Sequence, residues 1–261
     1  MLWLEILILA VVQGVAEFLP ISSSGHLVVG AALFDQFGHP ITDKLSVNIF
    51  LHLGTLLAIL VFYRRRIYVL LKEDRRVIGL LLAGSVPAAV AGLILKREFQ
   101  SSLETPITAG LMFPVTGLIL LWAARHQSGS MTCRELGYGR ALLIGVFQAF
   151  AILPGISRSG ATIAAGLACG LRRDEAAAFS FLLAIPAIAG AGLLETIKLL
   201  GESSAATPVG GLALGATVSF VVGLASLWWL IRWLDRGRLH LFAWWVIPLG
   251  AVVLAWQILG K

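Results

Sequence analysis

The sequence contains little charge. Only 13% of its 261 residues are Asp, Glu, Lys or Arg, whereas an ordinary soluble domain carries roughly 25%. Apolar residues make up 58% of the chain, and the mean hydropathy is +0.90. A soluble protein of this size could not keep so much apolar surface away from water. The composition therefore excludes a soluble protein and indicates a polytopic membrane protein.

Cysteine is also scarce. Cys133 and Cys169 are far apart in the sequence, which excludes a disulfide framework and a cysteine metal site, and we expect free thiols. The net charge is +6, but no basic stripe is interleaved with aromatic residues, so nucleic acid is excluded as a partner. Residues 2–12 are apolar but have no basic stretch before them and no small-residue cleavage site after them. We therefore expect no signal peptide there.

Long apolar runs are abundant. A helix that crosses the hydrocarbon core needs about 20 apolar residues. Six stretches meet this requirement, and they cover approximately residues 46–63, 77–95, 105–124, 176–200, 207–231 and 241–259.

Two further apolar regions are interrupted. Residues 2–34 are broken by Leu19-Pro-Ile-Ser-Ser-Ser-Gly-His26, and residues 141–171 by Leu153-Pro-Gly-Ile-Ser-Arg-Ser-Gly160. Each piece is short for a full crossing. Irregular backbone is tolerated at membrane depth only where it lines a polar cavity. We therefore expect two re-entrant pairs of half-helices that meet inside the membrane.

The two breaks resemble each other if one Gly is inserted in the second, and Gln13 and Gln148 occupy comparable places before them. This likeness suggests a duplicated unit made of a re-entrant pair and three spans. Because three is odd, the second copy would enter from the opposite face, as in an inverted-topology repeat. We therefore expect one all-α membrane domain over 1–261, with repeat 1 at approximately 1–125 and repeat 2 at approximately 136–261.

The positive charges give this arrangement an orientation. If residues 46–63 run inward, fourteen Lys and Arg residues fall in cytoplasmic loops and five fall outside, while Arg158 lies in the second break. The positive-inside rule favours this orientation over its inverse. The first re-entrant loop then opens from the outer face and the second from the inner face, so their tips would meet near the middle of the bilayer.

Polar residues at membrane depth are candidates for function, because an Asp, Lys or Arg at a helix centre costs at least ~2.5–3.5 kcal/mol on insertion. They cluster in the two breaks. The first region supplies Gln13, Glu17, Ser22, Ser23, Ser24 and His26, and the second supplies Gln148, Ser157, Arg158, Ser159 and Thr162. Gly160, between two of these residues, is a further candidate for substrate binding.

The carboxylate allows two interpretations. Gln13 and Glu17 are four residues apart, so a helix places both on one face. Together they could hold a hard cation such as Mg²⁺ or Ca²⁺, which prefers oxygen ligands. Alternatively, Glu17 pairs with Arg158 as a buried ion pair.

The serine-rich tips also allow two interpretations. Hydroxyls and N–H groups at a half-helix N-terminus bind anions, phosphate in particular, and the Arg158 guanidinium suits phosphate oxygens. The same serines could simply cap helices. His26 could carry a proton near neutral pH or remain a neutral hydrogen-bonded group. His52, in the first full span, is expected only to orient a loop.

The motifs resemble those of a known family. Gln13-Gly-Val-Ala-Glu17-Phe-Leu-Pro-Ile-Ser-Ser-Ser-Gly-His26 and Pro154-Gly-Ile-Ser-Arg-Ser-Gly160 are similar to the two signatures of the undecaprenyl-diphosphate phosphatases, the bacitracin-resistance membrane phosphatases. Shorter segments such as Leu51-His-Leu-Gly-Thr55 agree, and the likeness covers nearly the whole chain.

The resemblance implies hydrolysis of undecaprenyl diphosphate to undecaprenyl phosphate and inorganic phosphate. This reaction recycles the lipid carrier of cell-wall synthesis and confers bacitracin resistance. The resemblance also implies a site in the inner membrane that opens toward the outer face, and a supporting divalent cation. The matching positions are Glu17 as essential acid, Ser23 as nucleophile, His26 as acid/base group, Arg158 as phosphate ligand, Ser157, Ser159 and Thr162 as supporting ligands, and Gln148 in a supporting role. Gln13 stands where the family has Glu or Gln, which leaves the cation's ligands open.

Our mechanistic hypothesis follows these positions. Arg158 and the N–H groups of the breaks hold the diphosphate, Ser23 attacks the terminal phosphorus, and His26 activates water in a second step. His26 as nucleophile, or direct attack by water, remains open. A long prenyl chain requires a lateral opening between spans.

A lipid-phosphate flippase or anion transporter is the alternative function, because inverted repeats with broken helices also build carriers. Glycines such as Gly210, Gly211 and Gly215 could pack within one chain or between two, so a homodimer stays open.

Overall fold

The computed structural model describes residues 2–39, 41, 43–98, 103–125, 129–201 and 208–259, and it contains helices but no strand in these ranges. The helices are α1 (Leu2–Ala16), α2 (Ser23–Gln36), α3 (Lys44–Phe62), α4 (Arg64–Glu73), α5 (Arg75–Glu98), α7 (Pro106–Ala123), η1 (Cys133–Glu135), α8 (Tyr138–Phe150), α9 (Arg158–Ala168), α10 (Arg173–Gly201), α11 (Val209–Asp235), η2 (Leu239–Phe242) and α12 (Ala243–Leu259).

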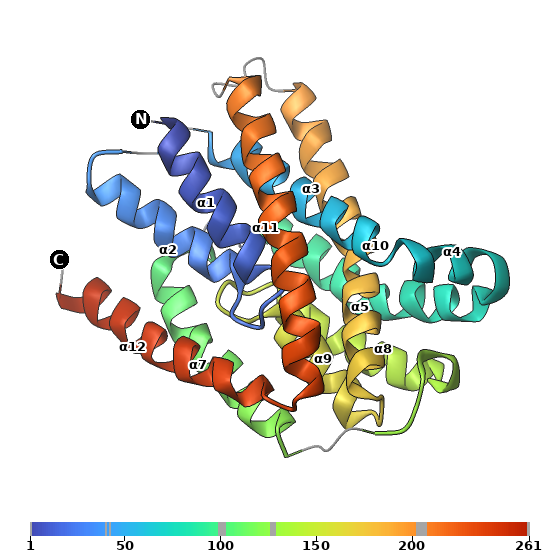
Figure 1. Ribbon diagram of the computed structural model, residues 1–261. Helices are drawn as coiled ribbons and strands as arrows, with labels where there is room; N and C mark the ends of the chain where they lie inside the picture. The colour runs from blue at the N-terminus through green and yellow to red at the C-terminus, as the bar shows by residue number, and fades with distance from the viewer. Residues whose placement is uncertain are drawn as a thin grey trace.

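The described residues include six helices that are long and apolar enough to cross a membrane, which confirms the six expected spans with shifts of a few residues at their ends. These helices are α3, α5, α7, α10, α11 and the segment from η2 through α12. In Figure 1, α10 and α11 rise together at the top, α7 and α12 lie along the lower left, and α4 projects to the right. Residues 64–73, which lie outside the expected spans, form this short amphipathic helix.

The interrupted regions fold as two pairs of shorter helices, α1 with α2 and α8 with α9. The backbone between the members of each pair contains Pro20 and Pro154, and a proline lacks the N–H that a helix interior requires. Gly155 adopts a φ of +99°, a conformation that L side chains rarely adopt. Ser22 has a φ of +72°, although it is not glycine. Both breaks therefore turn the chain sharply before the next helix begins.

Small residues allow the long helices to approach closely. A Cβ added to Gly54 on α3 would overlap the carbonyl oxygen of Ala216 on α11. A Cβ added to Gly145 on α8 would overlap the carbonyl oxygen of Gly84 on α5. Such close backbone contact is typical of helices that associate within membranes. Gly215 also packs within the chain, against Ile6.

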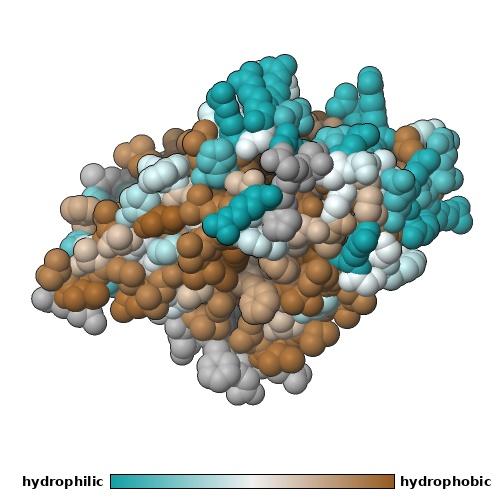
Figure 2. Space-filling view, turned by 90° about the horizontal axis from the view of Figure 1, so that it is seen from below, coloured by the Kyte–Doolittle hydropathy of each residue, from teal (hydrophilic) through white to brown (hydrophobic). Residues whose placement is uncertain are grey.

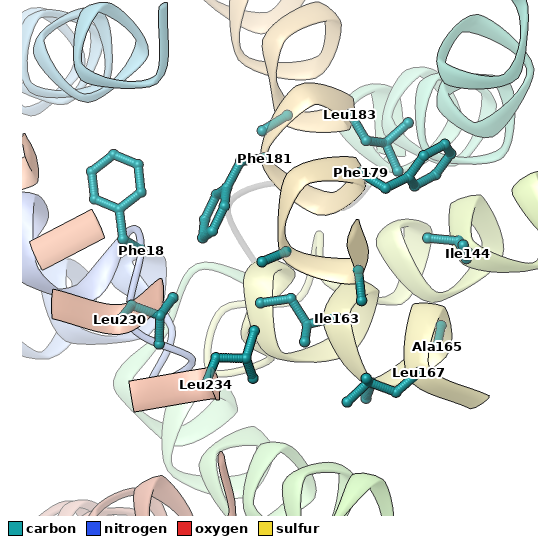
Figure 3. Packing of buried hydrophobic residues seen from close by; sticks show 14 of the residues in the cluster. Phe18, Ile144, Ile163, Ala165, Leu167, Phe179, Phe181, Leu183, Leu230 and Leu234 are labelled. Carbon is teal, nitrogen blue, oxygen red and sulfur yellow. The ribbon is translucent and has the colours of Figure 1, made fainter. Parts of the chain in front are cut away.

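The hydrophobic core surrounds α9. Figure 3 shows Ile163 of α9 among side chains from α8, α10 and α11, with Phe18 turned toward Phe181. The ring centroids of Phe18 and Phe181 are 5.6 Å apart, a separation typical of favourable aromatic pairs. This packing holds Phe18 of the first break against α10, which shares the same core cluster as α9.

The surface is largely apolar. Figure 2 shows hydrophilic residues gathered along one side of the viewed face and hydrophobic residues over most of the remainder. Large side chains such as Leu118, Val221 and Trp244 are more than half exposed. A surface of this kind is suited to contact with lipid rather than water. The composition and the structure therefore agree on a multi-pass membrane protein.

A polar cluster connects α4 and η1 to α10 through hydrogen bonds. Arg66 Nη2 donates to Glu175 Oε2 at 2.7 Å, and the backbone N–H of Cys133 donates to the same oxygen at 2.8 Å. Burial and the adjacent Glu175 carboxylate raise the pKa of the Cys133 thiol. Cys133 and Cys169 are both buried free thiols, as expected.

Candidate active site

The two breaks touch each other through hydrogen bonds. The hydroxyl oxygen of Ser22 accepts from the backbone N–H of Gly25, at 3.3 Å, and from that of Gly155 in the other break, at 3.1 Å. Ser159 Oγ donates in the reverse direction to the carbonyl oxygen of Leu19, at 3.3 Å. The chain thus brings together two motifs that are more than a hundred residues apart.

The two motifs also share one register. Ser22 caps α2 through the N–H of Gly25, and Ser157 caps α9 through the N–H of Gly160, each three residues later. Counting from these caps, Gln13 and Gln148 stand at the same distance, and no inserted residue is needed. The extra Gly155 between Leu153 and Ser157 is offset by one residue fewer between Gln148 and Leu153 than between Gln13 and Leu19. Ser23 and Arg158 then occupy equivalent positions, the first residues of α2 and α9.

Thr116 of α7 stabilises the second break. Its hydroxyl donates to the carbonyl oxygen of Gly155 at 2.7 Å and accepts from the N–H of Ser157 at 2.9 Å. The Ser157 and Ser159 hydroxyl oxygens lie 3.2 Å apart. A Cβ on Gly160 would lie 3.2 Å from the Cβ of Pro20. The backbone of this break is therefore held from both sides.

Glu17 is the centre of the assembly. Its Oε2 accepts from Ser23 Oγ at 2.6 Å and from Gln13 Nε2 at 3.1 Å, while its Oε1 accepts from Arg158 Nη2 at 2.5 Å. His52 Nε2 lies 3.8 Å from Oε2. The Glu17 side chain is only 6% exposed, so this carboxylate is compensated by a guanidinium and three polar neighbours. Of the two interpretations of Glu17, the ion pair with Arg158 is present.

Residues of α10 help to hold the Arg158 side chain in place. Its Nη1 donates to the carbonyl oxygen of Ser180 at 3.4 Å, and its own carbonyl accepts from Thr162 Oγ1 at 2.7 Å. The hydroxyl oxygens of Thr162 and Ser180 are 2.6 Å apart. A guanidinium has five N–H donors, so these contacts leave capacity for the oxygens of a phosphate.

A polar cavity of about 310 Å³ lies beside this assembly. Its polar lining consists of Glu17, Ser22, Ser23, Ser24, Asn48, His52, Ser157 and Arg158. Six of the twelve site residues expected from the sequence therefore line one space, while Gln13, His26, Gln148, Ser159, Gly160 and Thr162 do not. Hydroxyls, a carboxylate and a guanidinium in one cavity can bind and attack a phosphate.

His26 is not part of that lining. Its Nδ1 lies 2.7 Å from the carbonyl oxygen of Ser22, and its Nε2 accepts from Trp245 Nε1 at 3.1 Å. The ring also contacts Phe113, with centroids 5.0 Å apart. This geometry corresponds to a neutral imidazole whose Nδ1 carries the hydrogen, the second of the two interpretations of His26.

Sequence reasoning missed several polar neighbours. His52 lines the cavity instead of only orienting a loop, and its Nδ1 lies 2.9 Å from the carbonyl oxygen of Asn48. Thr55 Oγ1 accepts from Gln13 Nε2 at 3.5 Å, and Ser180 supports Arg158. The available signal was a polar side chain inside a long apolar run, which applies to all three residues.

Two further cavities adjoin the polar cavity. We name the first the apolar hollow; it has a volume of about 600 Å³, lies between α5, α8 and α10, and shares Ile152 and Arg158 with the polar cavity. We name the second the Lys44 pocket; it has a volume of about 530 Å³ and shares Ser24, Asn48 and Ile152 with the polar cavity. Arg158 thus stands between a polar and an apolar space.

The residues expected to hold a cation do not form a ready ligand set. Both carboxylate oxygens of Glu17 already accept hydrogen bonds, and only Gln13 Oε1 of this pair has no hydrogen-bond partner among the described residues. One amide oxygen and a carboxylate neutralised by Arg158 are a poor match for Mg²⁺ or Ca²⁺, which take six or more oxygen ligands. Within the described part of the chain, no cluster of three or more His, Cys, Asp or Glu residues is present either.

The chain resembles known proteins over nearly its whole length. Residues 6–252 match the family model described as bacitracin resistance protein BacA. A protein of Rhodopirellula baltica named undecaprenyl-diphosphatase is 52% identical over 251 residues, which cover 96% of each chain. Undecaprenyl-diphosphatase 4 of Bacillus cereus is 40% identical, over 98% of this chain and 97% of that protein. The undecaprenyl-diphosphatase of Rubrobacter xylanophilus is 39% identical, over 98% of both. With its two hydrogen-bonded breaks and its match from residue 6 to residue 252, the chain belongs to the bacitracin resistance protein BacA family.

Proposed function

We propose that this protein is a membrane phosphatase that hydrolyses undecaprenyl diphosphate to undecaprenyl phosphate and inorganic phosphate. This reaction recycles the lipid carrier of cell-wall synthesis, and abundant enzyme confers resistance to bacitracin. The observation that carries the proposal is the hydroxyl of Ser23, 2.6 Å from a carboxylate that also pairs with Arg158 at the wall of one cavity. Relatives with the corresponding name support it.

In the first step, Arg158 and the N–H groups at the start of α2 and α9 bind the terminal phosphoryl group. Ser23 Oγ attacks the phosphorus while its proton passes to Glu17 Oε2, which already accepts its hydrogen bond. The bond between the terminal phosphorus and the bridging oxygen breaks, and the lipid monophosphate leaves. Positioning and charge stabilisation supply most of the catalysis of such a transfer.

In the second step, water attacks the phosphoserine, the Oγ–P bond breaks, and Glu17 returns its proton to Ser23. The proton of the water passes to a base on the cavity wall. His52 is the imidazole that lies there, although the sequence assigned this step to His26. We propose that His26 acts as a positioning residue, because its ring holds the carbonyl of Ser22 between the two breaks.

We propose that the prenyl chain enters through the apolar hollow. The hollow lies between α5 and α10, and Leu93 and Leu193 in its lining are 59% and 63% exposed. These exposed leucines support a lateral opening toward the lipid. The terminal phosphate would then lie on the polar side of Arg158, and the lipid on its apolar side.

We further propose that the two halves form an inverted-topology repeat in the inner membrane. The packing of α8 on α5 and of α1 on α11 supports it, because the first helix of each interrupted pair contacts the second membrane-spanning helix of the other half. The Lys44 pocket, which joins the polar cavity, is the expected water route to the outer face.

Any divalent cation is proposed to arrive with the diphosphate, because Glu17 could ligate it only by giving up Arg158 or Ser23. A carrier function is less favoured, since transport needs binding groups but not a hydroxyl hydrogen-bonded to a carboxylate.

The test is release of inorganic phosphate from undecaprenyl diphosphate by purified protein in detergent, where no compartments exist. Ser23→Ala should reduce turnover by at least about 10²-fold, since it removes a nucleophile, and wild type should yield a trappable phosphoserine at Ser23. Ser226→Ala, outside the three cavities, is the matched control. Full activity of Ser23→Ala rejects the serine route, and no turnover by wild type, with labelled lipid still moving in liposomes, rejects the hydrolase.

A further inference from the structure

Gln148 is a buried carboxamide with no hydrogen-bond partner among the described residues. Its residue is 2% exposed, and neither Oε1 nor Nε2 has a partner. A buried polar group without a partner destabilises the folded protein, and such groups in native proteins call for an explanation. Gln148 lines the apolar hollow, which Arg158 also lines. The unpartnered amide therefore belongs to a residue in the wall of a space large enough for a ligand.

The duplicated register explains why this amide lacks a partner. In the first half, Gln13 Nε2 donates to Glu17, four residues later. In the second half, the residue four positions after Gln148 is Ile152. The side chain of an isoleucine cannot accept a hydrogen bond. The second copy thus retains the donor of the first copy and has lost its carboxylate acceptor.

Ile152 lines all three cavities. A carboxylate at this position would place a second negative charge in the space that a diphosphate must occupy. Its replacement by isoleucine leaves Gln148 Nε2 free to donate to an anion from outside the chain. The two halves therefore differ. The first half has the carboxylate of Glu17, and the second half has the Gln148 amide, which has no partner for its N–H groups among the described residues.

We propose, on the basis of the proposed function, that Gln148 binds the lipid-side phosphoryl group of the diphosphate. Its Nε2 donates to a non-bridging oxygen of that group at the junction of the apolar hollow and Arg158. The terminal phosphoryl group lies on the other side of the guanidinium, next to Ser23. Gln148 and Arg158 then hold the two phosphoryl groups on either side of the bond that breaks.

The test compares Gln148→Met with wild type in phosphate release. Methionine has nearly the same length but no donor, and a hydrogen bond to a charged group contributes about 1.5–3 kcal/mol. We expect kcat/KM to fall about tenfold or more. Inhibition by undecaprenyl phosphate should weaken to a similar extent, while inhibition by orthophosphate stays unchanged. The melting temperature in detergent should not fall, because no internal partner is lost.

Gln13→Met is the matched control from the other half. It should lower kcat, because Glu17 loses the hydrogen bond from Gln13 Nε2. It should leave inhibition by undecaprenyl phosphate unchanged. Ile152→Glu supplies the missing acceptor, and it should weaken lipid phosphate binding at least as much as Gln148→Met. If Gln148→Met alters orthophosphate inhibition, leaves kcat/KM unchanged, or lowers only the melting temperature, the assignment of Gln148 is wrong. Inactive wild-type protein would instead reject the proposed function.

Discussion

Ser23 and Arg158 begin equivalent helices, and their difference gives the site its chemistry. Each follows a serine cap, but one brings a hydroxyl and the other a guanidinium to the same carboxylate. A helix N-terminus attracts anions whichever residue begins it. Two serine-capped helix ends therefore meet at one carboxylate, and under the proposed function the first residue of one end attacks the phosphate while the first residue of the other holds it.

Variants of the two histidines test whether His26 positions the first break and His52 transfers the proton. His26→Asn keeps an N–H near the place of Nδ1, whereas His26→Gln moves the amide away from the Ser22 carbonyl that Nδ1 contacts. If His26 is a positioning residue, His26→Asn should remain within about tenfold of wild-type kcat, and His26→Gln should lose more. Phosphate release measures both, with His52→Gln for comparison.

A proton carrier at position 26 would give a different pattern. His26→Asn would then be as inactive as His26→Gln, because neither amide exchanges a proton at neutral pH. A His52→Gln variant with full activity would in turn remove His52 from the second step.

Site residues could be predicted where a charged or polar residue interrupts an apolar stretch of the sequence. Glu17 and Arg158 stand in apolar surroundings, so their pairing was one of two interpretations. The environment of His26 could not be predicted, because the partner of its Nε2 is Trp245, 219 positions away in the sequence. Likewise, only the folded packing places His52 next to Glu17.

Among the elements, the close crossing of α5 and α8 positions the second break, residues 151–157, which follows α8. Gly145 of α8 contacts the backbone of Gly84, and α8 leads directly into the residues before Arg158. Any side chain at position 145 would push the two helices apart. The position of Arg158 relative to Glu17 therefore depends on a contact between glycines.

We expect Gly145→Ala to destabilise the protein by about 1–3 kcal/mol through overpacking and to lower phosphate release. Gly139→Ala, in the same helix, is the control because a Cβ there has no atom within 4 Å. It should be neutral or stabilising by up to about 1 kcal/mol, since alanine favours helix. Melting temperatures in detergent measure both variants. Equal melting of the two would show that the crossing tolerates a methyl group.

The six spans could be predicted because their length and hydropathy are direct consequences of the thickness of a bilayer. The break between α4 and α5 could not, because it depends on Asp74, which accepts from Arg134 Nε at 2.6 Å. Contacts of this kind, sixty residues apart, leave no periodic pattern in the sequence.

For the whole molecule, the proposed orientation places Lys44 outside and Arg134 inside. Their side chains are 55% and 61% exposed, so cysteines at these positions should be reachable from water. In a background with Cys133→Ser and Cys169→Ser, we expect Lys44→Cys to react with a membrane-impermeant maleimide in intact cells. Arg134→Cys should react only after permeabilisation. The reverse pattern would invert the topology and place the Lys44 pocket on the cytoplasmic side.

The bridge from Ser22 to Gly155 has a consequence for biosynthesis. Chains are made from the N-terminus, and early segments settle before later ones exist. Glu17 is synthesised 141 residues ahead of Arg158, and Ser22, with its hydroxyl, is synthesised 133 residues ahead of Gly155. The nascent first half must therefore carry Glu17 without its guanidinium partner until residue 158 has been made, so a chain that ends before this residue lacks the charge pair of the site.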